Sequence, residues 1–457
     1  MPFRLKHALL IVAFALSSSQ TSSRAAAPAP DSRARLDSLF TILDTSHRMM
    51  GSVTVRKGNR VFYQRTIGYR DSTASGWVPS DSLTEFRIGS VTKPFTAVMI
   101  YQLVDEKRLS LDTRLSRFVP GLASADSVTI RDLLGHTSGM PDYTQGMDPM
   151  LKLDRAALVK RIASRPLQFQ PGTKRRYSNS NYLLLGYVIE AITKSTCDAQ
   201  LKKRIVDRVG LARTRFGGAV TPAANESRAY FFNGGHWELQ PDHVIENAGA
   251  AGGIVSTSSD MSLFLSALFS GRLISKASLA EMTRGFDDGT RINGKGIGPF
   301  TIKGTDKTGF SHDGGIGAHS ALVGYVPEDS LSLALTVNGH NFPINRVFFL
   351  VWNILYATDM PLPTFTPVAL TTATAASVAG AYASQAYGLK ITVRRVGDAM
   401  EGQTEGEAPF PITYVGKNRF VFERDGILLE FADPVAGASP QFTLYQQLYA
   451  IPLTRVP

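Results

Sequence analysis

Residues 90–93 read Ser90-Val91-Thr92-Lys93 and open a stretch in which apolar residues recur with helical spacing. Residues three apart on a helix share a face, so we expect the amine of Lys93 beside the hydroxyl of Ser90. A serine hydroxyl becomes an effective nucleophile when a base takes its proton, and burial lowers the pKa of a lysine enough for this task. A Ser-x-x-Lys pattern occurs by chance about once in a chain of this length. Taken alone, it would indicate only the exposed start of a helix.

Two later stretches give the pair a chemical context. Tyr177-Ser178-Asn179 precedes an apolar run, and His312-Asp313-Gly314-Gly315 leads into an expected strand. A tyrosine beside a lysine can relay a proton to a leaving group, and an asparagine amide can both donate to and accept from a substrate amide. Glycines at the start of a strand let a ligand approach the backbone closely.

In this order, the three elements resemble the serine β-lactamase and penicillin-binding protein superfamily. The resemblance is to its class C-like branch, in which the second element is Tyr-x-Asn and the third is often His-x-Gly. It extends from about Asp31 to Met360 and includes flanking stretches at residues 132–140, 177–186 and 251–260. It implies an α/β sandwich: an antiparallel sheet flanked by helices, with a helical subdomain between the first and second elements and the site in the cleft between sheet and helices.

The resemblance also implies the catalytic roles. Ser90 would be the acylated nucleophile, and Lys93 and Tyr177 would share the base and acid steps. No metal or organic cofactor is implied. Four further histidines have no metal-ligand spacing among themselves, namely His236, His243, His319 and His340.

The substrate-binding roles follow from the same resemblance. Asn179 would contact the substrate amide, and His312 with Gly314 would form the wall of the site that a strand provides. The backbone N–H groups of Ser90 and Gly315 would form the oxyanion hole.

The third element has a second candidate. Lys307-Thr308-Gly309 is a literal Lys-Thr-Gly triplet that begins five residues before His312. His312 fits the strand register better, since glycines and then an expected strand at 320–326 follow it. A lysine here would attract a substrate carboxylate, whereas a histidine is mostly neutral near pH 7. His312 therefore favours a peptidase or an esterase over a β-lactamase, and the choice between His312 and Lys307 stays open.

Two other stretches receive structural interpretations. His136 precedes Thr137-Ser138-Gly139, where turn chemistry explains the residues, so we expect no catalytic role for His136. Residues 247–253 are rich in glycine but lack the lysine of a phosphate-binding loop. We therefore expect them to form a tight structural turn.

Composition and the N-terminus indicate where the protein acts. The 457 residues carry a net charge of +11, but the basic residues are scattered, so we expect no nucleic-acid partner. Residues 1–27 combine a basic start, a short apolar run and Ala25-Ala26-Ala27, which is typical of a cleavable export signal. We expect a secreted or periplasmic protein with no membrane span after cleavage. Cys197 is the only cysteine, so an internal disulfide is excluded.

The C-terminal part reads as a second module. A proline-rich break at residues 361–367 separates the expected hydrolase domain, residues 31–360, from residues 368–457. Short alternating segments in the latter predict a small all-β module that resembles lipocalin-like barrels. Its expected strands are residues 390–396, 419–422, 427–431 and 442–449.

These observations predict a secreted serine hydrolase that forms an acyl-enzyme on Ser90. The leading expectation is a peptidase or amidase that resembles D-alanyl-D-alanine carboxypeptidases. An esterase or weak β-lactamase of the same fold is the alternative, and a non-catalytic sensor of peptidoglycan or β-lactams is the alternative from another class. The substrate is therefore a small peptide, ester or β-lactam.

Overall fold

The computed structural model describes residues 28–285, 294–302, 304–358, 360–446 and 449–457. The expected export signal at 1–27 lies outside this range. The chain forms two compact units, a larger one of residues 33–286 and 291–348 and a smaller one that contains residues 349–457. Among the described residues, no helix combines the length and apolarity needed to cross a membrane.

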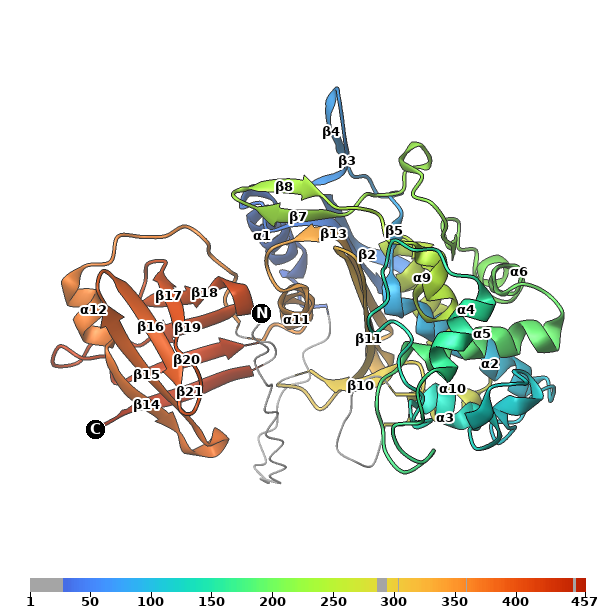
Figure 1. Ribbon diagram of the computed structural model, residues 1–457. Helices are drawn as coiled ribbons and strands as arrows, with labels where there is room; N and C mark the ends of the chain where they lie inside the picture. Colours follow the sequence, from blue (N-terminus) through green and yellow to red (C-terminus); the bar gives the residue numbers. More distant parts are fainter. Residues whose placement is uncertain (1–27, 286–293, 303, 359, 447–448) are drawn as a thin grey trace. The chain divides into compact units, whose positions relative to one another are not determined.

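The larger unit is built on an antiparallel sheet with the strand order β10-β11-β12-β13-β1-β2 (Figure 1). The strands are β1 Met49–Lys57, β2 Arg60–Ile67, β10 Gly298–Thr301, β11 Thr308–Ile316, β12 His319–Val326 and β13 Leu331–His340. Pairing of β1 with β13 joins the two ends of the unit. The expected antiparallel sheet is confirmed.

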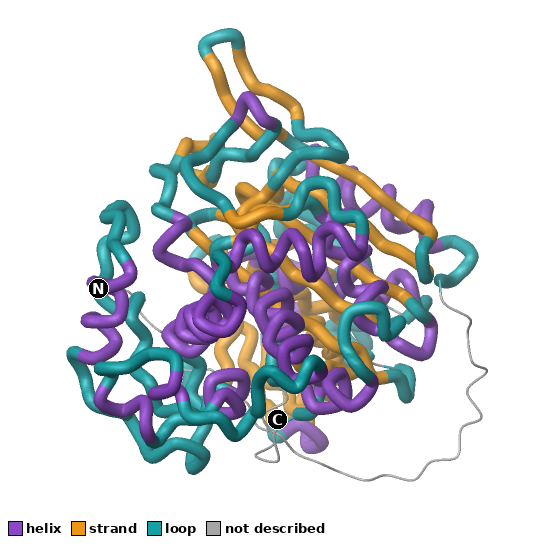
Figure 2. The backbone as a smooth tube through the Cα atoms, turned by 90° about the vertical axis from the view of Figure 1, so that its right-hand side faces the viewer, coloured by secondary structure: helices purple, strands orange, loops and turns teal. Residues whose placement is uncertain are grey.

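Helices flank this sheet, as the sequence predicts. They are α1 Ser32–Thr45, α2 Thr92–Asp105, α3 Ile130–Gly135, α4 Arg155–Ala163, α5 Asn179–Thr193, α6 Cys197–Leu201, α7 Asp207–Val209, α8 Gly249–Gly252, α9 Ser258–Phe269 and α10 Lys276–Thr283. A further helix, α11 Ile344–Leu355, includes the boundary between the two units. Figure 2 views the molecule from the side of the helical region, whose helices lie in front of the strands. The expected helical subdomain between the first and second elements contains α3 and α4.

Helix α2 is the centre of the core. Every residue from Thr92 to Leu103 is buried, because the helix is apolar nearly all round and has neighbours on all sides. The rings of Phe95 and Phe264 stack with their centroids 3.8 Å apart, which joins α2 to α9. Pro94 lies in the first turn, where its missing N–H needs no partner. The helix therefore holds residues 90–93 on a rigid element.

Several short strands were not predicted from the sequence. Two hairpins, β3 with β4 and β7 with β8, and the small sheet β5-β9-β6 lie outside the main sheet. Their bounds are β3 Tyr69–Thr73, β4 Gly76–Pro79, β5 Phe86–Arg87, β6 Arg215–Phe216, β7 Tyr230–Asn233, β8 His236–Leu239 and β9 Ile254–Ser256. Strands of two to five residues carry too few alternating positions to be recognised by periodicity.

The smaller unit contains a closed barrel of eight antiparallel strands, β14 to β21 in order, with β14 paired to β21. The strands are β14 Gly380–Ser384, β15 Leu389–Val396, β16 Ala399–Thr404, β17 Phe410–Tyr414, β18 Arg419–Phe422, β19 Ile427–Phe431, β20 Gln441–Gln446 and β21 Tyr449–Val456, and α12 Thr372–Val378 precedes them. The all-β expectation is confirmed. The expected strand at 442–449 is wrong in extent, because β20 ends at Gln446 and β21 begins at Tyr449.

Aromatic side chains fill the barrel. Tyr382, Phe420, Phe431 and Phe442 are buried and contact one another through tilted and edge-to-face ring pairs. Ring centroids in these pairs are 4.8 to 5.6 Å apart, the range in which aromatic pairs are favourable. The interior is thus a packed core.

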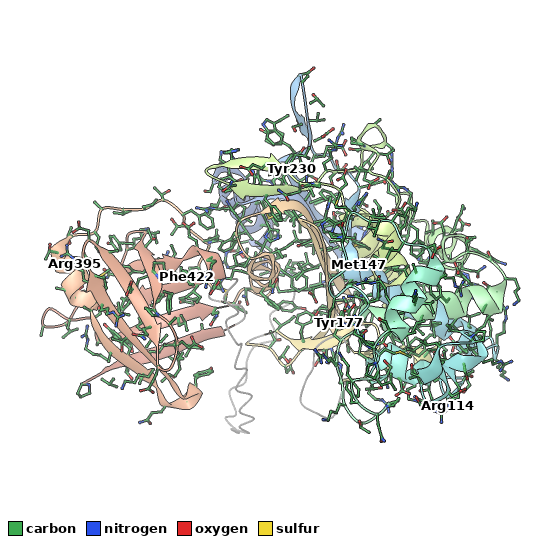
Figure 3. The ribbon with its side chains drawn as sticks, viewed as in Figure 1. Arg114, Met147, Tyr177, Tyr230, Arg395 and Phe422 are labelled. Carbon is green, nitrogen blue, oxygen red and sulfur yellow. The ribbon has the colours of Figure 1, made fainter. Side chains whose placement is uncertain are left out.

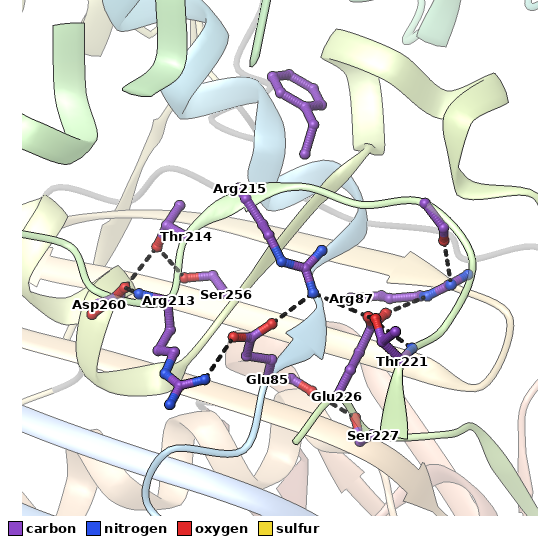
Figure 4. A network of polar contacts seen from close by, with 12 residues as sticks. Glu85, Arg87, Arg213, Thr214, Arg215, Thr221, Glu226, Ser227, Ser256 and Asp260 are labelled. Atoms are coloured by element: carbon purple, nitrogen blue, oxygen red, sulfur yellow. Dashed lines mark hydrogen bonds and ion pairs between the residues drawn. The ribbon is translucent and has the colours of Figure 1, made fainter. Parts of the chain in front are cut away.

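A buried ion-pair network lies just before Ser90 in the chain (Figure 4). Arg87 on β5 pairs with Glu226, and their side chains are 3% and 0% exposed. The same guanidinium donates to the carbonyl oxygens of His243, at 2.7 Å, and Gly218, at 2.9 Å. Glu226 also accepts from Arg215 at 3.1 Å. The network fixes the segment that enters the Ser90 turn.

We predict that Arg87→Met lowers the free energy of unfolding by about 3 kcal/mol, because it leaves the buried carboxylate of Glu226 and two carbonyl groups without their main partner. Urea denaturation followed by circular dichroism measures the change. Arg213→Met is the matched control, since the Arg213 side chain is 37% exposed and its pair with Glu85 is long, at 3.4 Å. The control is expected to lose less than about 1 kcal/mol. Equal losses in both variants would contradict the assignment.

Candidate active site

Ser90 lies in a short 3-10 turn, Gly89–Val91, that runs directly into α2. Strand β11 crosses this turn so closely that only glycine fits. A Cβ atom on Gly314 would lie 2.6 Å from the backbone nitrogen of Ser90, and one on Gly89 would lie 2.6 Å from that of Gly315. Gly89 also has a φ of +51°, which glycine adopts without strain. The structure thus brings Ser90, Gly314 and Gly315 together, as the sequence predicts.

The side chain of Lys93 is fully buried and has three polar neighbours. Its Nζ lies 2.8 Å from Ser90 Oγ, 2.9 Å from Asn179 Oδ1 and 2.7 Å from the carbonyl oxygen of Ala251. The amide and carbonyl oxygens can only accept, so they take two N–H donors. A neutral amine has two N–H groups and one lone pair. The lone pair of neutral Lys93 therefore faces the Ser90 hydroxyl.

Burial lowers the pKa of Lys93 from 10.5 to about 7, and the nearby carboxylates of Asp142 and Asp313 partly oppose this change. Desolvation dominates because an ammonium group loses most of its hydration in a closed site. Near neutral pH, a large fraction of Lys93 is therefore uncharged. This is the protonation state that a base for Ser90 requires.

Tyr177 supplies the second contact to the nucleophile. Its phenol donates to Ser90 Oγ at 2.9 Å, and the amine of Lys93 lies 4.9 Å from the centre of its ring. Figure 3 places Tyr177 between the sheet and the helical region. Burial raises the pKa of Tyr177, so the phenol stays protonated at neutral pH. Tyr177 is thus arranged to give a proton, whereas Lys93 is arranged to take one.

Asn179, the first residue of α5, is held at both ends of its amide. Its Oδ1 accepts from Lys93, and its Nδ2 donates to Asp142 at 3.0 Å. Asp142 also accepts from the backbone N–H of Asn179. One amide N–H and one lone pair of Oδ1 remain for a substrate, which are the donor and the acceptor expected from the sequence. Sequence reasoning missed Asp142 because its loop has no recognisable spacing to the other elements.

His312 lies within β11, opposite Val323 of β12, and its side chain faces the buried side of the strand. Its Nδ1 donates to the carbonyl of Asp313 at 2.6 Å, and burial lowers its pKa to about 4. The imidazole is therefore neutral at pH 7. Lys307 precedes β11 and forms an ion pair with Asp329. Of the two candidates for the third element, His312 is the one that interacts electrostatically with Lys93 and His136.

The ring of His136 packs against the ring of Tyr177. It is 1% exposed, and its ring stacks on that of Tyr177 with centroids 4.4 Å apart. Its Nδ1 accepts from the backbone N–H of Ser178 at 3.2 Å and from Asn181 Nδ2 at 3.0 Å. Burial holds its pKa well below 6.5, so the ring is neutral. His136 contacts neither Ser90 nor Lys93 in a hydrogen bond, and its place is that of a positioning residue.

Residues 247–253 do more than the tight turn predicted from the sequence. They form a 3-10 turn followed by α8, and the carbonyl oxygens of Ala250 and Ala251 accept from Thr96 and Lys93 of α2. The glycines allow the helix backbone to approach closely. A backbone carbonyl leaves no side-chain signature, which explains why sequence reasoning missed this partner of Lys93.

The comparisons with known proteins agree with this geometry. A family model described as Beta-lactamase matches residues 36–347. The chain belongs to this family. Within the described parts of this β-lactamase family protein, no three His, Cys, Asp or Glu side chains are grouped so that they could hold a metal ion.

Three individual proteins illustrate the relationship. Penicillin-binding protein 4* of Bacillus subtilis is 29% identical over 264 residues, which is 54% of this chain and 58% of the relative. The D-stereospecific amidohydrolase of Streptomyces sp. is 27% identical with a TM-score of 0.59, covering 68% of this chain and 95% of that one. A penicillin-binding protein homologue from Pyrococcus abyssi, described as octameric, is 22% identical with a TM-score of 0.64, covering 92% and 99%. At 22% identity, this similarity shows the fold alone. The chain spans about two fifths to three fifths of the first curated relatives that it matches.

We predict that the rate of Ser90 acylation rises with pH through a midpoint near 7. The pKa of Lys93 is lowered to about 7, so the amine is charged below this pH and becomes a free base above it. The measurement is the second-order rate of labelling by a fluorophosphonate between about pH 5 and about pH 9. A rate that rises only above about pH 9 would mean that Lys93 keeps its ordinary pKa and is not the base.

We also predict that His136→Asn lowers the acylation rate about tenfold to a hundredfold, because the ring that holds Tyr177 is lost. His136 has a left-handed φ of +57°, which asparagine tolerates, so the backbone is expected to stay folded. The labelling rate and circular dichroism are measured together. An unchanged rate in a folded variant would contradict a positioning role.

Proposed function

We propose that the protein is a secreted serine hydrolase that cleaves amide bonds through an acyl-enzyme on Ser90. The observation that carries the proposal is the buried Nζ of Lys93, which lies 2.8 Å from Ser90 Oγ and whose other two polar contacts are to Asn179 and Ala251. A base arranged in this way has no purpose in a protein that only binds. The non-catalytic sensor is therefore the weaker reading.

The site suggests a two-step reaction. Ser90 Oγ attacks the substrate carbonyl carbon while its proton passes to Lys93, and the N–H groups of Ser90 and Gly315 stabilise the oxyanion. The C–N bond then breaks as Tyr177 gives a proton to the leaving nitrogen and is reprotonated by Lys93. Water attacks the acyl-enzyme in the second step, with Lys93 and Tyr177 again handling its proton, and releases the acid and free Ser90.

The proposed substrates are amides and peptides of D-amino acids. The expectation from sequence is a reaction that resembles D-alanyl-D-alanine carboxypeptidases, and relatives named penicillin-binding protein and D-stereospecific amidohydrolase support this substrate class. Esters are the second candidate, because the same attack on an ester needs less help from Tyr177. The neutral imidazole of His312 replaces a fixed charge at the third element, which disfavours β-lactams that carry a carboxylate.

Secretion is part of the proposal. It rests on the sequence of residues 1–27, whose basic start, short apolar run and three alanines are typical of an export signal. Cell-wall peptides and their fragments would be available to the exported protein.

We predict that a fluorophosphonate adds one mass increment to the protein and that the modified peptide contains Ser90. Ser90→Ala is expected to abolish labelling with an unchanged circular dichroism spectrum, and Lys93→Ala to reduce the labelling rate at least a hundredfold. Intact-protein mass spectrometry measures both. A wild-type protein that gains no mass would refute the hydrolase, and a fully active Lys93→Ala would refute the assigned base.

A further inference from the structure

One side of strand β11 is open beside the nucleophile. Strand β10 pairs only with residues Thr308–Ser311, whereas β12 pairs along the whole of Phe310–Ile316. From His312 onward, the described residues place no strand beside this edge of β11, and the backbone at Gly314 packs against the turn that carries Ser90. A substrate carbonyl held at Ser90 would therefore lie close to this part of the strand.

Asp313 is the charged residue of this open stretch. Side chains alternate along a strand, so His312 and Asp313 point to opposite faces. His312 is 3% exposed, whereas the side chain of Asp313 is exposed to solvent. Among the residues that the structure describes, the Asp313 carboxylate has no hydrogen bond or ion pair. Its charge is thus available to a ligand.

The charge of Asp313 reaches the reacting groups. It raises the pKa of Lys93, Tyr177 and His312. Arg175 acts on Tyr177 and His312 in the opposite sense, with a smaller effect than Asp313. Lys307 is paired with Asp329, and the imidazole of His312 is neutral. Asp142 adds a second negative charge near Lys93.

We propose that Asp313 determines the substrate class: the site rejects peptides with a free carboxylate next to the scissile bond and accepts amides whose leaving group is neutral or cationic. This rests on the proposed function, because it describes the substrate of the same Ser90 site. It favours an amidase over a carboxypeptidase. Like charges at short range weaken binding most when the site excludes water and salt.

The test compares N-acetyl-D-Ala-D-Ala with its C-terminal amide, two peptides that differ in one charge. The wild type is expected to hydrolyse the amide with a kcat/KM about tenfold or more above that of the free acid at low salt, and the ratio should shrink as salt rises. In Asp313→Asn, the ratio is expected to fall to within about twofold of unity. The ratio cancels any effect of the substitution on Lys93, since both peptides use the same base.

Asp306→Asn is the matched control. Asp306 is also exposed and lies in the loop before β11, so the variant has the same net charge as Asp313→Asn. It should keep the wild-type ratio. An equal kcat/KM for both peptides in the wild type, or an unchanged ratio in Asp313→Asn, overturns the role of Asp313 while leaving the hydrolase intact.

Failure of the proposed function has a different signature. In that case neither peptide is cleaved and fluorophosphonate does not label Ser90. If labelling occurs without cleavage, the two peptides are compared as protectants of Ser90 against the reagent. Better protection by the amide supports the proposal, and equal protection overturns it.

Discussion

The burial of one amine organises the site. Lys93 is enclosed by α2, α5 and α8, and its contacts to Ala251 and Asn179 fix where its third position points. A charged amine in this place is penalised by lost hydration, which brings its pKa to about 7. Two further contacts hold the neighbours of Lys93 in place. Asp142 orients Asn179, and His136 holds Tyr177 against the same amine.

The fold brings the chain segments around Ser90 into close contact. An apolar helix, α2, passes through the core and carries Lys93 one turn after the nucleophile. Gly89 and Gly314 let the Ser90 turn and β11 come into backbone contact. The buried pair of Arg87 and Glu226 anchors the chain at the entrance to this turn. The buried core makes the site rigid, and a few residues at the edge of the core carry the reactive groups.

Much of this could be predicted from the sequence, because the elements that carry the chemistry are local. The Ser90–Lys93 spacing indicates a shared face, and the strand register favours His312 over Lys307 without any coordinates. Asp142 and Ala251 could not be found, since each acts through a contact between distant segments and one acts through its backbone. The sequence interprets His136 as part of a turn, and its stacking on Tyr177 could not be found because it depends on tertiary packing. The same limit applies to the barrel, where β20 ends at Gln446 and β21 begins at Tyr449 within what reads as one long strand.

The closed barrel has a consequence for how the smaller unit can be shortened. Each strand pairs with its neighbour in sequence, and only the pairing of β14 with β21 closes the ring. Removing β21 would leave two open edges, on β14 and β20, and expose the aromatic interior at the gap. Unpaired edges of this kind recruit strands from other molecules. The last strand therefore protects the protein against self-association as well as completing a fold.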